Sequence, residues 1–287
     1  MNRILKNDNL NKDLHRFGYV KLNEVMSKSV MDEFLKQSKV LIREHSSRFP
    51  KGELFNFINA SLDLKRASNE LVKNYLNEEL IKHLDLNYVD LYPVSHIIKP
   101  FGTKGQIWHQ DSAVVNETKD FSLNAWMPFK KSSMINGCLW IIPGTHQLTN
   151  YKRQFGFNPI EGSFLKNLRK YMKPVIVEKG DVLLFYRNVI HGSSINWTPF
   201  RRIAAESLIV SKNAQFVNFH REDALQKNKI IEFKVSVEHF LKENPKEDFY
   251  SKSTPYTLHE DEAKEQIIQK INKELKDIIN ETSFKLP

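Results

Sequence analysis

The chain has 287 residues, of which 40% are hydrophobic, so it can bury a substantial core as one large domain or two small ones and is not intrinsically disordered. Its 43 Lys and Arg residues exceed its 34 Asp and Glu residues, but charges of both signs are interspersed along the sequence. The net charge of +9 therefore indicates a solvated surface, and we expect no nucleic-acid partner.

Cys138 is the single cysteine, so an intrachain disulfide is excluded and a buried thiol in a reducing compartment is expected. The N-terminus lacks the apolar region of a signal peptide, and no run of about 18 apolar residues occurs. We therefore expect a cytoplasmic protein with no membrane partner, which acts as a monomer or a homodimer.

Two amphipathic helices are predicted in the N-terminal part of the chain. The first covers about residues 24–45, where Ser27 or Ser29 can begin the helix and Val30, Phe34 and Leu41 are apolar. The second covers residues 69–84, and its apolar positions are Leu71, Tyr75, Leu76 and Leu80.

From about residue 88 to residue 210 the sequence changes to short β-rich runs that are separated by turn signals, with no helices between them. The main runs are 88–98, 106–115, 122–129, 136–146, 174–181, 182–194 and 201–210. This order favours a sandwich or barrel over a parallel α/β sheet, so the expected fold class is mainly β with flanking helices.

No linker rich in Pro, Gly or Ser divides the chain, so we expect a single domain over residues 1–287. Within it we distinguish an N-terminal helical support (1–87), a β core (88–210) and a C-terminal extension (211–287). The extension ends in an amphipathic helix whose apolar stripe, formed by Ile267, Ile271, Leu275 and Ile278, is expected to cover the core. A dimer contact is the alternative.

The run QIWHQDSAVV (106–115) places a histidine and an aspartate two positions apart in mostly apolar or β-branched surroundings. If the run is a strand, His109 and Asp111 leave the same face and Gln110 points away. The pair could then share one metal ion, or the two side chains could simply hydrogen-bond each other. The local stretch leaves both interpretations open.

A second histidine, His191, follows a predicted strand in NVIHGSS. Two imidazoles and one carboxylate form the facial set that holds Fe(II) and leaves positions open for oxygen and a cosubstrate. Arg202 can bind a carboxylate through two parallel hydrogen bonds, which indicates a dicarboxylate cosubstrate, and the Ser193 hydroxyl can join it. Taken singly, these residues could instead cap a turn, pair with a surface glutamate or serve turn chemistry.

The blocks WHQD, INGCLWIIPGTH and KGDVLLFYRNVIHGSS, with the arginine that follows, resemble the phytanoyl-CoA dioxygenase (PhyH) family of Fe(II)/2-oxoglutarate-dependent oxygenases, including its ectoine hydroxylase-like members. The resemblance covers roughly residues 10–210. It implies a double-stranded β-helix, which is a cupin-like jelly roll whose mouth holds the iron. It also implies Fe(II) as the metal, with 2-oxoglutarate and O2 as cosubstrates.

Carried over by position, the resemblance makes His109, Asp111 and His191 the metal ligands. Arg202 and Ser193 match the group that holds the distal carboxylate of 2-oxoglutarate. Halogenating relatives replace the acidic ligand by a small residue, so Asp111 argues against that activity.

The resemblance also suggests roles for residues around this site. His96 falls where related enzymes place a polar residue toward the cosubstrate, although a hydrogen-bonded core histidine is the alternative. Lys99, Lys104, Asn124 and Trp126 are expected to line or flank the site, and Asn124 and Trp126 are candidate substrate residues. The block that contains His146 is a turn that shapes the barrel, so a structural role is expected for that histidine.

Regular alternation from Arg202 would place Ala204, Glu206 and Leu208 on its inward face. An inward carboxylate is costly unless it is paired. Glu206 could pair with a Lys or Arg of the protein, or a bulge could turn it to solvent. Alternatively, it could receive a cationic or hydrogen-bond-donating group of the substrate.

The function that we predict is a 2-oxoglutarate-dependent non-heme iron dioxygenase. Its substrate is expected to be a small polar molecule, amino-acid-like or a natural-product intermediate, in preference to an acyl-CoA. Hydroxylation of a C–H bond is the commonest outcome, but desaturation, epimerisation or ring formation would begin identically. The alternatives are a non-catalytic cupin-like binding protein and an oxygen-independent cupin isomerase or epimerase.

Overall fold

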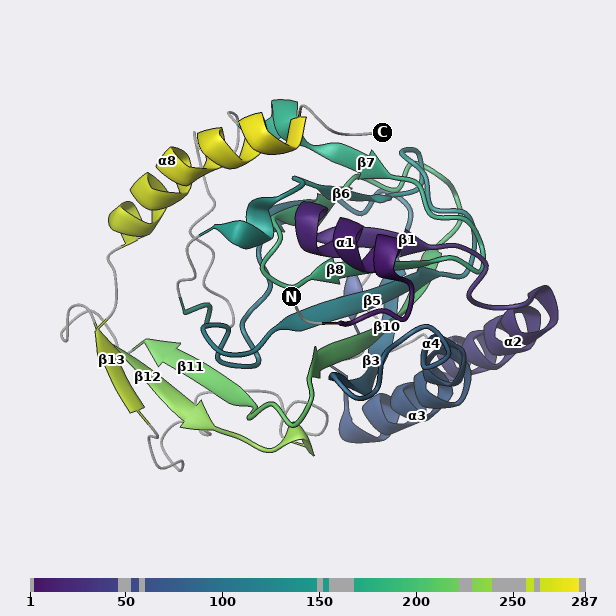
Figure 1. Ribbon diagram of the computed structural model, residues 1–287. Helices are drawn as coiled ribbons and strands as arrows, with labels where there is room; N and C mark the ends of the chain where they lie inside the picture. The colour runs from purple at the N-terminus through teal and green to yellow at the C-terminus, as the bar shows by residue number, and fades with distance from the viewer. Residues whose placement is uncertain are drawn as a thin grey trace.

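Two facing β-sheets form the centre of the molecule (Figure 1). The computed structural model describes residues 3–45, 53–56, 60–148, 152–154, 168–221, 229–238, 257–260 and 264–283. Apolar side chains from both sheets, among them Trp126, Ile141, Leu183 and Ala204, pack together between them. The predicted jelly-roll core with flanking helices is therefore confirmed.

The larger sheet has the strand order β1-β8-β5-β10-β3-β2, and the smaller has the order β4-β9-β6-β7. The strands of the larger sheet are β1 (Tyr19–Leu22), β8 (Val182–Tyr186), β5 (Ser122–Pro128), β10 (Arg202–Ser211), β3 (Val89–Lys99) and β2 (Phe55–Asn56). Those of the smaller sheet are β4 (Gln106–His109), β9 (His191–Ser193), β6 (Leu139–Ile141) and β7 (Lys173–Val175). A third sheet contains β11 (Val217–Arg221), β12 (Lys229–Lys234) and β13 (Thr257–Glu260).

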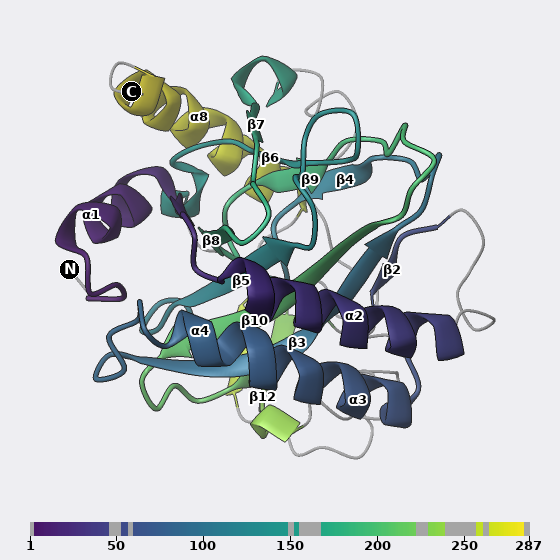
Figure 2. The ribbon, with the colours of Figure 1, turned by 90° about the vertical axis from the view of Figure 1, so that its right-hand side faces the viewer.

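Helices cover the outer face of the larger sheet, as Figure 2 shows for α2 and α3. The helices of the N-terminal part are α1 (Asp8–Phe17), α2 (Lys28–Glu44), α3 (Leu62–Val72), the π-helical turn η3 (Lys73–Asn77) and α4 (Glu78–Leu80). The predicted first helix is confirmed as α2, which begins after Ser27, whose hydroxyl accepts a hydrogen bond from the Val30 N–H at 3.4 Å. The predicted second helix begins earlier than expected, at Leu62.

The N-terminal part also contributes strands to the larger sheet, which the helical prediction for residues 1–87 did not include. Gly18 ends α1 with φ 80°, a left-handed conformation that favours glycine, and β1 begins at the next residue. β1 pairs with β8 at one edge of the sheet, and β2 pairs with β3 at the other.

The C-terminal helix α8 (Lys264–Ser283) packs against the smaller-sheet side of the molecule (Figure 1). Ile267, Ile271, Leu275 and Ile278 are all buried, and their cluster includes the partly buried Trp108 and Trp140. The predicted covering role of this stripe is confirmed. No helix in the described part of the chain is both long and apolar enough to cross a membrane.

Candidate active site

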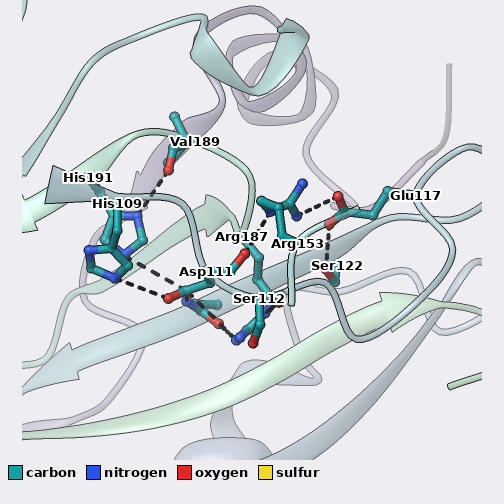
Figure 3. Close-up of polar contacts among 10 residues, drawn as sticks. His109, Asp111, Ser112, Glu117, Ser122, Arg153, Arg187, Val189 and His191 are labelled. Carbon is teal, nitrogen blue, oxygen red and sulfur yellow. Dashed lines mark hydrogen bonds and ion pairs between the residues drawn. The ribbon is translucent and has the colours of Figure 1, made fainter. Parts of the chain in front are cut away.

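His109, Asp111 and His191 lie together at the inner side of the smaller sheet (Figure 3). His109 ends β4 and His191 begins β9, and the two residues are directly paired across the sheet. One ligand atom of each of the three side chains lies within 4.8 Å of the other two. This convergence is the one expected for a facial metal site.

The predicted strand over residues 106–115 is wrong in extent, because β4 ends at His109 and Asp111 lies beyond it. The Asp111 N–H instead donates to the Arg187 carbonyl at 2.8 Å, which fixes the backbone after the strand. The two side chains still meet, with 3.3 Å between His109 Nε2 and Asp111 Oδ1.

His191 has its imidazole oriented for metal binding through Nε2. Its Nδ1 lies 3.0 Å from the Val189 carbonyl, which can only accept, so Nδ1 carries the proton and Nε2 keeps its lone pair. Burial lowers the pKa of His191 to about 4, and the neighbouring His109 contributes to this shift. A neutral imidazole at neutral pH is the form that a metal ion requires.

Asp111 is held as a carboxylate by two neighbouring side chains (Figure 3). The Asn124 amide donates to Oδ2 at 2.5 Å, and Arg187 Nη1 lies 3.8 Å from the same oxygen. Arg187 Nη1 also donates to Asn124 Oδ1 at 2.6 Å. Burial acts to raise the pKa of Asp111, but Arg187 and the two histidines hold it well below its usual value.

Asn124, which was predicted as a candidate substrate residue, is a member of this network. Its side chain is buried, and both of its amide atoms are engaged with Asp111 and Arg187. The role that the geometry supports is orientation of Asp111 from behind.

Arg153 supports Asp111 from another segment of the chain. Its Nε donates to the Asp111 backbone carbonyl at 2.7 Å, and its Nη2 pairs with Glu117 in a buried ion pair. Sequence reasoning identified neither Arg153 nor Arg187. Arg187 could have been noticed as a charged residue immediately after the buried strand that precedes His191, whereas Arg153 has no local signal.

A second polar group, formed by two buried cations, lies where β3 ends and β10 begins. Lys99 and Arg202 are paired across these strands, and they are 0% and 6% exposed. Lys99 Nζ donates to Ser193 Oγ at 2.8 Å and to the Lys104 carbonyl at 3.3 Å. Arg202 Nη1 donates to the Gly137 carbonyl at 2.8 Å, while its buried Nε has no hydrogen-bond partner in the structure.

Neither cation forms an ion pair with a carboxylate of the described residues. Burial lowers the pKa of Lys99 to about 7, with a further contribution from Arg202, and burial lowers the pKa of Arg202 to about 10. An anion bound between them would stabilise the charged forms of both side chains. The pair therefore forms a candidate anion site. The Ser193 hydroxyl contacts it through Lys99.

Trp126 belongs to this anion site. The guanidinium carbon of Arg202 lies 5.1 Å from the centroid of the Trp126 ring, and the tryptophan is only 2% exposed. This contact places Trp126, which was predicted as a candidate substrate residue, beneath the Arg202 guanidinium. Lys104 contributes its backbone carbonyl to Lys99, and Cys138 is buried and free, as expected.

His96 does not face either polar group, so its predicted cosubstrate role is wrong. Its Nε2 and Nδ1 hydrogen-bond Ser38 Oγ at 2.9 Å and Ser68 Oγ at 2.8 Å, which belong to α2 and α3. Its ring stacks on Phe129, and burial lowers its pKa to about 3. The alternative of a hydrogen-bonded core histidine is the one that the structure supports.

His146 has the structural role that was expected. Its Nε2 lies 2.9 Å from the His15 carbonyl, and its ring stacks on Tyr186. A Cβ atom at Gly18 would lie 2.4 Å from His146 Nδ1, so only glycine permits this close approach between α1 and the turn.

Glu206 lies on the inner face of β10, as the alternation from Arg202 predicted. Ala205 and Ser207 point to the helices, since Ala205 joins the helix-side core and Ser207 donates to Asn77 at 2.6 Å. Glu206 is 9% exposed and has no hydrogen-bond or ion-pair partner among the described residues. Neither pairing with a basic residue nor rotation to solvent therefore describes it.

The fold and the site together define a jelly-roll protein with a candidate His–Asp–His metal centre and a neighbouring anion site. The chain belongs to the phytanoyl-CoA dioxygenase (PhyH) family, whose profile matches residues 14–204. The resemblance stated from the motifs is thereby confirmed.

Curated relatives of this family match parts of the chain. The phytanoyl-CoA dioxygenase domain-containing protein 1 homolog of Dictyostelium discoideum is 30% identical over 166 residues, which are 54% of this chain and 59% of that protein. Phytanoyl-CoA dioxygenase 1 of Oryza sativa subsp. japonica is 29% identical over 115 residues, which are 38% of this chain and 40% of that protein. The matches thus span less than two thirds of each relative.

A solved structure shares the fold over most of the chain. The epimerase SnoN, crystallised with Fe3+, alpha ketoglutarate and nogalamycin RO, superposes with a TM-score of 0.53 at 17% identity. The match covers 89% of this chain and 95% of that chain. At this identity the likeness concerns the fold alone.

Proposed function

We propose that the protein is an Fe(II)- and 2-oxoglutarate-dependent oxygenase that hydroxylates a C–H bond of a small polar molecule. The observation that carries the proposal is the presence of a His–Asp–His group beside strands of the smaller sheet and of two buried cations without a carboxylate partner, Lys99 and Arg202, on strands of the larger sheet. Strand β9 joins them, because it contributes His191 to the first group and Ser193 to the second. Residues two apart on a strand lie about 7 Å from each other and share a face.

The donor set fits Fe(II). Two neutral imidazoles and one carboxylate bind this metal while leaving positions open, and His191 Nε2 is left free by the Val189 hydrogen bond. When bound, the metal supplies redox chemistry with oxygen that no side chain provides. The related fold of SnoN, which was crystallised with Fe3+ and alpha ketoglutarate, is consistent with the proposal.

The cation pair fits a dicarboxylate cosubstrate. Arg202 offers its unpaired Nε to a carboxylate while its Nη1 donates to the Gly137 carbonyl, and Lys99 adds a second positive charge. One carboxylate of 2-oxoglutarate would bind there while its other end reaches the metal. The protein's part is then to orient the cosubstrate, keep Asp111 ionised and present one C–H bond of the substrate.

The test is succinate formation from 2-oxoglutarate by the purified protein supplied with Fe(II) and ascorbate. We expect succinate in air and none under nitrogen or with a chelator. A Glu178→Gln variant, which changes a surface carboxylate paired with Lys131, serves as the matched control and should behave like the wild type. Absence of succinate from the iron-loaded protein in air, with every candidate substrate tried, would contradict the proposal and favour a binding protein or an oxygen-independent enzyme.

A further inference from the structure

Glu206 occupies a defined place on the inner face of the larger sheet. It lies between Trp126 of β5 and Ser95 of β3, its partners in the two flanking ladders. The pairing with β3 shifts only after this residue, between Glu206 and Ser207. Its inward direction is therefore fixed by regular pairing from Arg202 onward.

Along β10, Glu206 lies closer than Arg202 to the candidate metal ligands. Glu206 lies four positions after Arg202, a rise of about 13 Å along β10. Leu208, two residues beyond Glu206, is paired with Asn124, whose amide holds Asp111. A cosubstrate that extends from Arg202 to the metal would leave Glu206 on the side where the substrate must bind.

No cation of the described residues neutralises Glu206. Two basic residues act on Glu206, Arg187 and His109, and both already interact with Asp111. Arg187 lies 3.8 Å from Asp111 Oδ2 and donates to Asn124 and to the Ser112 carbonyl, and His109 Nε2 lies 3.3 Å from Asp111 Oδ1. A buried carboxylate without a partner is destabilising unless a ligand provides one. Burial accordingly raises the pKa of Glu206 to about 7, and Asp111 adds to the rise.

We infer that Glu206 binds a protonated amine, or another basic nitrogen, of the substrate. The inference rests on the proposed function and narrows its substrate class to cationic or zwitterionic small molecules. A positively charged group would form a charge-assisted hydrogen bond with the carboxylate and restore its ionised form. Polyanionic substrates such as acyl-CoA thioesters lack this group and are disfavoured beside Glu206 and Asp111.

The inference is tested with small probes that differ only in charge. n-Butylammonium and the similarly shaped neutral n-butanol are titrated into protein supplied with 2-oxoglutarate and Zn(II), a diamagnetic substitute for iron, and binding is followed by saturation-transfer NMR. We expect n-butylammonium to bind the wild type roughly tenfold more tightly than n-butanol does, because only the cation pairs with Glu206.

Variants of the carboxylate complete the test. Glu206→Gln, which keeps the shape and removes a buried charge, should weaken n-butylammonium binding roughly tenfold and leave the melting temperature unchanged or higher. Glu206→Asp should retain the preference for the cation, and the surface control Glu178→Gln should match the wild type. Equal affinities of the two probes, no n-butylammonium binding, or wild-type binding in Glu206→Gln would each overturn the inference. Since these measurements need no turnover, they are independent of the succinate assay that tests the proposed function.

Discussion

The two faces of the β3–β10 pair bury polar side chains in different ways. On the helix-facing side, both ring nitrogens of His96 have serine partners and the Ser207 hydroxyl donates to Asn77. On the inner side, the Arg202 Nε has no partner, and Glu206 has none among the described residues. All four residues are buried, so burial alone does not explain the difference.

The difference lies in whether the protein itself satisfies the buried groups. A buried polar group whose hydrogen bonds are complete stabilises one packing arrangement, whereas an incomplete one is destabilising until a ligand binds. His96 is of the first kind, and Arg202 and Glu206 are of the second. The comparison predicts that changes on the inner face alter ligand binding, while changes on the helix-facing side alter stability.

The largest effect is expected for Asp111→Ala. Loss of the only carboxylate of the triad should reduce both iron binding and succinate formation at least about 100-fold, because the two imidazoles alone hold the metal weakly. The fold should persist, since Asp111 contributes little to the apolar core. Metal content after gel filtration and circular dichroism check the two outcomes. A folded Asp111→Ala variant with full activity would exclude the triad assignment.

Arg202→Lys is expected to have the next largest effect. The substitution keeps the charge but removes the planar fork, so the KM for 2-oxoglutarate should rise roughly 10- to 100-fold, the scale of one charge-assisted interaction. The KM is measured from succinate formation at saturating Fe(II). An unchanged KM would transfer the role to another cation, with Arg201 as the first candidate and Lys99 as the second.

The fold class could be predicted from the sequence because its signals are local, whereas the candidate metal triad was predicted from separate blocks that together resemble a known family. Short strands separated by turns distinguish a β-sandwich from alternating α/β, and a facial metal site requires fixed donor types in recognisable blocks. The inward direction of Glu206 could also be predicted, since alternation from Arg202 holds up to the shift in pairing with β3.

The orientation of His96 could not be predicted, because β3 is buried on both faces. One face meets the helices and the other meets the interior, so no contrast between polar and apolar positions fixes the phase of the strand. The supports of Asp111 were missed for another reason. Asn124, Arg153 and Arg187 come from three separate segments, and only the folded chain brings them together.

Asn124→Ala tests this support of the metal ligand. Removal of the amide that holds Asp111 Oδ2 should weaken metal affinity by about tenfold, with the KM for 2-oxoglutarate unchanged within about twofold. Titration with Co(II), followed by its visible absorption, gives the affinity. Unchanged metal affinity combined with poorer coupling of 2-oxoglutarate consumption to substrate oxidation would instead restore a direct substrate role.

His96→Phe should have the smallest effect on activity and a clear effect on stability. The phenyl ring keeps the stacking on Phe129 but removes the imidazole partner of the Ser38 and Ser68 hydroxyls, while Ser68 Oγ still accepts from the backbone N–H of residue 96, so the free energy of unfolding should fall by about 1–3 kcal/mol. The KM for 2-oxoglutarate should stay within about twofold of the wild-type value. A tenfold rise in this KM would re-establish the cosubstrate role that the structure argues against.

The pH dependence of stability gives an independent check on His96. Its pKa falls from 6.5 to about 3 on folding, so below pH 6.5 the unfolded chain binds a proton that the folded protein does not. Its contribution to stability is therefore complete above pH 6.5 and is lost as the pH falls toward 3, with a slope of up to about 1.4 kcal/mol per pH unit. Urea unfolding between pH 7 and pH 4.5 should show a shallower loss of stability in His96→Phe than in the wild type, because phenylalanine cannot take up the proton. Equal slopes in the two proteins would mean that His96 is not buried in its neutral form.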